Sequence, residues 1–114
     1  MQGEPMIDDG LETTNEPVVR RVQVLNPPGL HARPASVLAA RARQFQCEIE
    51  LVLVDAGSGR ASEIGTRVDA KSILDVIVLG AAQGAQLDVI ATGADASEAA
   101  AALEALFRSS FGME

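Results

Sequence analysis

The sequence is poor in the residues that build disulfides, metal sites and nucleic-acid surfaces. It contains one cysteine, one histidine, no tryptophan and no tyrosine in 114 residues. One cysteine cannot form an internal disulfide, and one cysteine with one histidine cannot form a standard zinc site. We therefore expect neither a disulfide-stabilised secreted domain nor a bound metal. The formal net charge of −7 and the few aromatic side chains also argue against nucleic-acid binding.

Long hydrophobic runs are absent as well, so we expect no membrane insertion. Residues 1–17 hold five acidic and no basic side chains, which is the wrong charge for a signal or transit peptide. The remaining residues, 18–114, hold eleven acidic and nine basic side chains. We predict that 1–17 are a disordered acidic extension, that 18–114 form one domain, and that the protein is cytoplasmic.

The hydrophobic pattern predicts the element order β-α-β-β-α-β-α. Period-two alternation predicts strands over residues 18–25, 47–54, 63–68 and 86–91. Apolar residues at helical spacing predict helices over residues 32–45 and 95–109. Residues 72–79 are ambiguous by periodicity, and their capping residues favour a short helix. The connection over 55–66, between the second and third strands, is long for a hairpin. Strands adjacent in sequence favour an α+β fold, a mostly antiparallel sheet with the helices on one face.

Two of the predicted helices begin at residues suited to capping. Ser72 is expected to be an N-cap with Asp75 at the third helical position, and Gly80 then ends that helix. Asp95 is expected to cap the last helix, with Glu98 closing a capping box.

The stretch Gly29-Leu30-His31-Ala32-Arg33-Pro34-Ala35-Ser36 carries the chemistry. His31 lies at a predicted helix start, where the first N–H groups have no acceptor within the helix and attract anions. Arg33 adds a guanidinium suited to phosphate oxygens, and a neutral imidazole is a nucleophile. We expect His31 to accept a phosphoryl group, held by the backbone of Ala32 and Arg33 and by the Arg33 side chain. Gly29 allows the chain to turn sharply before the imidazole.

The expected strength of this site fits a carrier better than a kinase. A helix N-terminus contributes about 0.3–1 kcal/mol to an exposed anion, and a charged hydrogen bond from arginine about 1.5–3 kcal/mol. Those energies orient a phosphoryl group without trapping it. The sequence shows neither an acidic cluster for Mg²⁺ nor a P-loop. The alternative is that His31 is an ordinary polar residue at a helix start, and physical reasoning alone weighs the two about equally.

Two stretches of the sequence, GLHARPAS and AKSILDVIVLGAAQGAQLDVIATG, resemble the histidine-containing phosphocarrier (HPr) family of the bacterial phosphotransferase system. The resemblance covers about residues 19–111, and ALFRSSF near the end resembles the family's nitrogen-branch members. It implies an open-faced β-sandwich with a four-stranded antiparallel sheet and three helices. It also implies that His31 is phosphorylated on Nδ1 by enzyme I, with phosphoenolpyruvate as the ultimate donor, that Arg33 assists, and that an enzyme IIA domain then receives the group.

The resemblance carries further expectations about partners and regulation. A carrier of this kind needs no cofactor and is expected to be a monomer. Since it is covalently modified without independent turnover, whether it counts as an enzyme is open. Ser72 would be a regulatory serine modified by an HPr kinase/phosphorylase, although a plain N-cap explains it equally well. The alternative function is a regulatory binding module on the same fold, controlled through Ser72.

The resemblance finally implies an apolar docking surface for enzyme I and enzyme IIA beside His31. The residues expected to contribute to it are Ser36, Arg43, Ile73, Leu74 and Ile77. The alternative for the three apolar residues is the core, and we expect at least one of them to be buried there. Arg41 is expected to lie with Arg43 at the rim of this surface or to be an ordinary solvated charge.

Overall fold

The computed structural model describes residues 16–57 and 63–112. Most of the predicted extension, residues 1–15, and residues 58–62 of the long connection lie outside this part. The predicted order of strands and helices is confirmed. The elements are β2 (Val18–Gln23), α1 (Ala32–Ala42), β3 (Glu48–Asp55), β4 (Arg67–Asp69), α2 (Ile73–Leu79), β5 (Gln86–Thr92), α3 (Ala96–Arg108) and the short 3-10 turn η2 (Ser110–Gly112).

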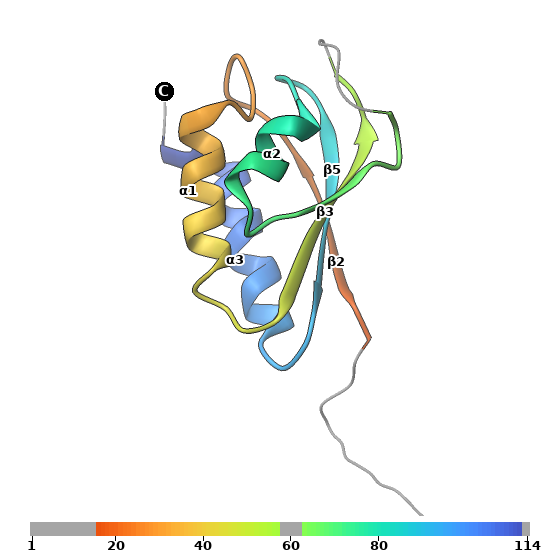
Figure 1. Ribbon diagram of the computed structural model, residues 1–114, viewed down its shortest axis with the longest axis vertical. Helices are drawn as coiled ribbons and strands as arrows, with labels where there is room; N and C mark the ends of the chain where they lie inside the picture. Colours follow the sequence, from red (N-terminus) through yellow and green to blue (C-terminus); the bar gives the residue numbers. More distant parts are fainter. Residues whose placement is uncertain (1–15, 58–62, 113–114) are drawn as a thin grey trace, which may run out of the picture.

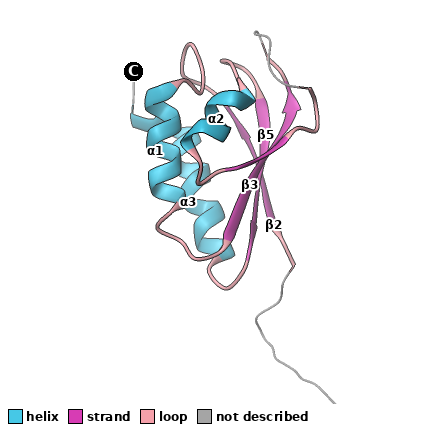
Figure 2. Ribbon diagram, viewed as in Figure 1, coloured by secondary structure: helices cyan, strands magenta, loops and turns pink. Residues whose placement is uncertain are grey.

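The strands form one antiparallel sheet in the order β2-β5-β3-β4. All three helices cover the same face of the sheet, as the sequence predicts (Figures 1 and 2). The inward side chains of β3 are Ile49, Leu51 and Leu53, and they alternate with outward-facing residues. The open face instead carries exposed ion pairs, including Arg21–Asp88 at 2.6 Å. The chain thus has the α+β architecture with one covered and one open sheet face.

The core between sheet and helices is almost entirely aliphatic. Its largest fully buried side chains include Leu38 of α1, Leu79 of α2 and Leu103 of α3. Phe107 and Phe111 meet edge to face with their ring centroids 4.9 Å apart. Because each helix buries leucine or phenylalanine in one shared core, the helix starts are held at fixed positions relative to the sheet.

Helix α1 ends earlier than the sequence predicts. It stops at Ala42, with Arg43 as C-cap, whereas the apolar spacing predicts a helix to residue 45. The Arg43 N–H still bonds to the Ala39 carbonyl, and Gln44 and Phe45 continue as turns. Phe45 remains partly buried against the core, which explains why it fits the helical pattern although it lies beyond the helix. The Arg41 guanidinium lies 5.1 Å from the centroid of the Phe45 ring.

The predicted strand over 63–68 is also displaced, since β4 begins only at Arg67. Gly65 has a φ of +92°, and the Thr66 N–H bonds to the Glu63 carbonyl at 3.0 Å. These residues therefore form a turn before the strand starts.

The predicted capping box at Asp95 is wrong. Asp95 is the N-cap of α3, but its side chain makes no capping hydrogen bond. The carboxylate instead accepts the N–H groups of Gln46 and Cys47, both at 2.9 Å. The Gln46 N–H is the main reason that the pKa of Asp95 is lowered. The residue therefore fixes the entry into β3 rather than the first turn of its own helix.

Candidate functional site

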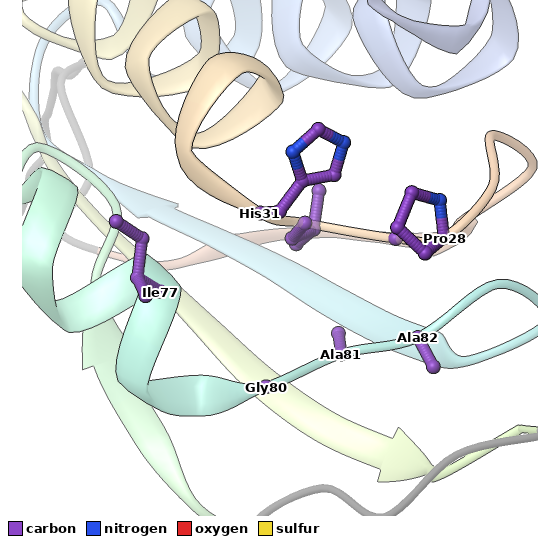
Figure 3. A pocket seen from close by; sticks show the side chains of 8 residues that line it. Pro28, His31, Ile77, Gly80, Ala81 and Ala82 are labelled. Atoms are coloured by element: carbon purple, nitrogen blue, oxygen red, sulfur yellow. The ribbon is translucent and has the colours of Figure 1, made fainter.

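His31 is the N-cap residue of α1 and is exposed. Its backbone is extended, with φ −84° and ψ −166°, and its side chain makes no capping hydrogen bond. The imidazole therefore projects from the loop in front of the helix (Figure 3). A capping serine or aspartate would turn its oxygen back to the first-turn N–H groups, whereas this imidazole leaves them available.

Two backbone donors stay available at this helix start. The Ala35 N–H bonds to the His31 carbonyl at 2.9 Å, and Pro34 has no N–H. The N–H groups of Ala32 and Arg33 are then the first-turn donors that have no acceptor within the helix. They are the same two groups that the sequence predicts as the phosphate-binding backbone. An anion on the imidazole would lie at the positive end of the helix dipole.

Arg33 is exposed in the first turn of α1. Its guanidinium forms no hydrogen bond or ion pair within residues 16–57 and 63–112. By contrast, the Arg43 guanidinium donates from Nε to the Lys71 carbonyl at 2.9 Å. Arg33, in the same turn as the helix start, can therefore turn toward a group on His31.

The loop in front of α1 is held by the chain that follows α2. Leu30 N donates to the Ala81 carbonyl at 2.8 Å, and Gln83 N donates to the Pro28 carbonyl at 3.0 Å. At Gly29 (φ +139°), a Cβ atom would lie 2.4 Å from the Ala81 oxygen. Gly29 thus allows the predicted turn and also a close backbone approach that no other residue permits.

A shallow cavity of about 290 Å³ opens beside the imidazole. Residues 28–31 line one side, and Ile77 with residues 80–82 line the other. Figure 3 shows His31 and Ile77 on facing elements, the loop before α1 and helix α2. The structure therefore joins the predicted acceptor to the predicted docking helix in one surface.

Helix α2 presents an exposed apolar surface made of Leu74, Ile77 and Val78. The exposed fractions of Leu74 and Val78 are both 73%, and that of Ile77 is 37%. Ile73, which the sequence also predicts for docking, is half-buried and packs against the core. None of the three predicted apolar residues is therefore fully buried, and Ile73 is the one that contacts the core. Val78 was missed, although it lies four residues after Leu74 and so on the same side of the helix.

The other predicted site residues lie on α1 or at the ends of the helices. Ser36 is exposed on α1, one turn after Ala32, and Arg43 is exposed beyond the end of that helix. Ser72 is the N-cap of α2, and its hydroxyl oxygen accepts the Asp75 N–H at 3.2 Å, as predicted. Gly80, with φ +71°, ends the helix, also as predicted.

No second reactive centre stands out elsewhere in the described residues. Burial is the main reason that the pKa of the Cys47 thiol is raised to about 11, and a hydrogen bond with Asp95 adds to it. Such a thiol is a poor nucleophile at neutral pH. Within residues 16–57 and 63–112, no group of three or more His, Cys, Asp or Glu residues could hold a metal ion. In the same part of the chain no helix has the length and apolar character to cross a membrane.

An exposed imidazole at an uncapped helix start, two residues before an arginine without a partner among the described residues, is the arrangement expected of a small phosphoryl-carrying protein. Comparisons with known proteins agree. Residues 18–109 match the family model PTS-HPr, described as the PTS HPr component phosphorylation site. The chain therefore belongs to the HPr family, the phosphocarriers of the phosphotransferase system.

Relatives named HPr and NPr match the chain to nearly the same extent. Phosphocarrier protein HPr of Treponema pallidum is 37% identical over 94 residues, covering 82% of this chain and 96% of the relative. Phosphocarrier protein NPr of Escherichia coli is 36% identical, covering 82% of this chain and 94% of the relative. The crystal structure of HPr from Thermoanaerobacter tengcongensis superposes with a TM-score of 0.73 at 33% identity, covering 85% of this chain and 98% of that one.

Proposed function

We propose that His31 is the residue of this phosphocarrier that takes up the phosphoryl group. The observation that carries the proposal is the exposed imidazole at a helix start whose first two N–H groups have no acceptor among the described residues. His31 is also the only histidine in the sequence, so a phosphohistidine has no other position. The donor is enzyme I and the acceptor an enzyme IIA domain, as the family resemblance implies.

The transfer uses few groups of this chain. The lone pair of the ring nitrogen Nδ1 attacks phosphorus, and the new P–N bond forms as the bond to the donor breaks. The N–H groups of Ala32 and Arg33 and the Arg33 guanidinium stabilise the phosphoryl oxygens. Their combined energy is a few kcal/mol. The phosphorylated protein can therefore pass the group on.

The test is phosphorylation with enzyme I, phosphoenolpyruvate and Mg²⁺, followed by mass spectrometry. We expect the mass of one phosphate to be added, and the modification to be labile in acid. His31→Ala should take up none, whereas Gln44→Ala, exposed beyond the far end of α1, should behave as the wild type. Uptake by His31→Ala, or no uptake by the wild type, would refute the proposal.

We propose that Leu74, Ile77 and Val78 form the docking surface for enzyme I and enzyme IIA, with Ser36 and Arg43 at its margin. The support is their exposure on α2, the helix whose Ile77 lines the cavity together with His31. Leu74→Asp should raise KM for the carrier as a substrate of enzyme I. Val19→Asp is the matched control, because Val19 is an apolar residue of β2 that is 48% exposed. Equal effects of the two variants would contradict this assignment.

Regulation through Ser72 is the second candidate, and the structure supports a capping role for this residue. Its hydroxyl already accepts the Asp75 N–H, and a phosphate would add about two negative charges next to the Asp75 carboxylate. Incubation with ATP and an HPr kinase/phosphorylase tests the modification, which should be acid-stable and absent from Ser72→Ala. A lack of label in the wild type would leave Ser72 as a cap.

We further propose that the protein works as a monomer in the cytoplasm and that residues 1–17 are a separate acidic extension. Light scattering of the purified protein tests whether it is a monomer, and fractionation of cells tests whether it lies in the cytoplasm. Deleting residues 1–17 and measuring transfer at low and moderate salt tests whether the acidic charges steer partners. Unchanged rates at both salt concentrations would exclude such steering.

A further inference from the structure

Asn26 is a polar residue enclosed behind the loop that carries His31. Its exposed fraction is 3%, and among the described residues it is the one polar side chain that is buried. Its Nδ2 group donates to the Gly29 carbonyl at 3.0 Å. Its Oδ1 atom has no hydrogen-bond partner among the described residues. A buried acceptor without a partner lowers the stability of the fold. Asn26 is therefore expected to have a function that offsets this cost.

The partner of Asn26 connects it to the reacting residue. The Gly29 carbonyl accepts two hydrogen bonds, one from Asn26 Nδ2 and one from the His31 N–H at 2.9 Å. Gly29 has the φ of +139° that makes the turn, so its carbonyl direction fixes how the chain enters α1. Asn26 thus fixes the Gly29 carbonyl, and this carbonyl in turn accepts the His31 N–H.

The other contacts of this loop act at different points. The Pro28 carbonyl and the Leu30 N–H bond to residues 81–83, and Gln83 Nε2 donates to the Leu25 carbonyl at 3.0 Å. These bonds attach the loop to the segment after α2. The Asn26 side chain instead bonds to the Gly29 carbonyl, which also accepts the His31 N–H.

We infer that Asn26 is a positioning residue for phosphoryl transfer, an inference that rests on the proposed role of His31. By fixing the Gly29 carbonyl, Asn26 keeps the imidazole in line with the N–H groups of Ala32 and Arg33. An error in that alignment reduces the rate of the chemical step, because the reacting atoms must be held in a narrow geometry. Loss of the Asn26 bond should leave the docking surface on α2 unchanged, because Asn26 is not part of that surface.

The main experiment measures kcat and KM with the carrier as a substrate of enzyme I. Asn26→Ala and the nearly isosteric Asn26→Leu both remove the donor to Gly29. We expect kcat to fall roughly tenfold while KM changes by less than about twofold. Gln83→Ala is the matched control, because it removes a side-chain donor to the same loop but not to Gly29. Unchanged kcat in both Asn26 variants, or an equal fall of kcat in the control, would overturn the inference.

A measurement on the wild type covers the case in which the variants fail to fold. On phosphorylation, the NMR signals of the Asn26 side-chain amide and the His31 backbone amide should shift together, and those of the Gln44 side chain should not. A shift at His31 with none at Asn26 would overturn the inference. If the wild type takes up no phosphate, the proposed function of His31 fails instead, so the two failures are distinguishable.

Discussion

The first turns of α1 and α2 are built in opposite ways. Both follow an extended N-cap residue, but Ser72 accepts the Asp75 N–H with its side chain, whereas His31 makes no such bond. The capped start gains stability, typically about 1 kcal/mol. The uncapped start keeps its positive end for a ligand. This chain therefore lacks a stabilising side-chain cap at the helix start where we propose that a phosphoryl group binds.

The third helix shows that an acidic N-cap residue can serve neither purpose. The Asp95 carboxylate turns away from α3 and binds the N–H groups of Gln46 and Cys47. It joins two distant parts of the chain instead. Variants of the three N-cap residues can therefore separate chemistry, helix capping and loop attachment.

The largest effect is expected from giving α1 the cap that it lacks. His31→Ser should abolish phosphorylation by enzyme I, because the nucleophile is gone. It should also be more stable than His31→Ala by about 0.5–1 kcal/mol, since serine is a good N-cap. Mass spectrometry and urea unfolding measure the two effects. Equal stability of the two variants would mean that the first turn of α1 has no unmet donors.

Arg33→Ala should come next, with kcat/KM for phosphoryl transfer lower by roughly ten- to a hundredfold, the equivalent of one charged hydrogen bond. Urea unfolding should change little, because Arg33 is exposed and makes no ion pair within the part of the chain described. Arg41→Ala is the control, a cation of the same helix whose guanidinium lies over Phe45. A comparable loss of transfer in the control would indicate a general charge effect.

A smaller effect is expected at α2. Ser72→Ala should lower the free energy of unfolding by about 1 kcal/mol, whereas Ser72→Asp should preserve it because aspartate also caps helices. Urea denaturation of the three proteins measures this. If alanine is tolerated without loss, the hydrogen bond to Asp75 contributes nothing to stability and the contrast with His31 disappears.

The smallest effect is a pH dependence at Asp95. The Gln46 N–H lowers the pKa of this carboxyl in the folded state, opposed by burial and aided by Cys47. The ionised carboxylate therefore stabilises the fold above the unfolded pKa, and this stabilisation is lost as the pH falls through the lower folded-state value. The stability difference between wild type and Asp95→Asn should begin to shrink below about pH 4. A constant difference down to strongly acidic pH would contradict the assigned bonds.

Features that depend on neighbouring residues could be predicted from the sequence. Ser72, Asp75 and Gly80 bound α2 as their spacing predicts, because capping is decided within one or two turns. The position of His31 at the start of α1 is equally local. The partners of Asp95 could not be predicted, since Gln46 and Cys47 lie nearly half the chain away and meet it only in the folded structure.

The docking surface shows a second reason for error. Helical spacing tells which residues of α2 share a side, but not which side faces the core. That choice depends on where α1 and the sheet lie, and it buries Val76 and Leu79 while exposing Leu74 and Val78. The role of Gly29 was only half predicted for the same reason, because the approach of the Ala81 carbonyl comes from a distant part of the chain.

The direction of β2 determines where this protein tolerates added sequence. Val18 pairs with Ala91, whereas Gln23 pairs with Gln86 close to the segment that supports the His31 loop. The strand is six residues long, so its start lies roughly 20 Å from that loop, at the opposite end of the sheet (Figure 1). Helix α3 and η2 return the chain toward the start of α1. An affinity tag or a fused reporter placed ahead of β2 therefore leaves the surface around His31 accessible. One placed after η2 would lie close to that surface.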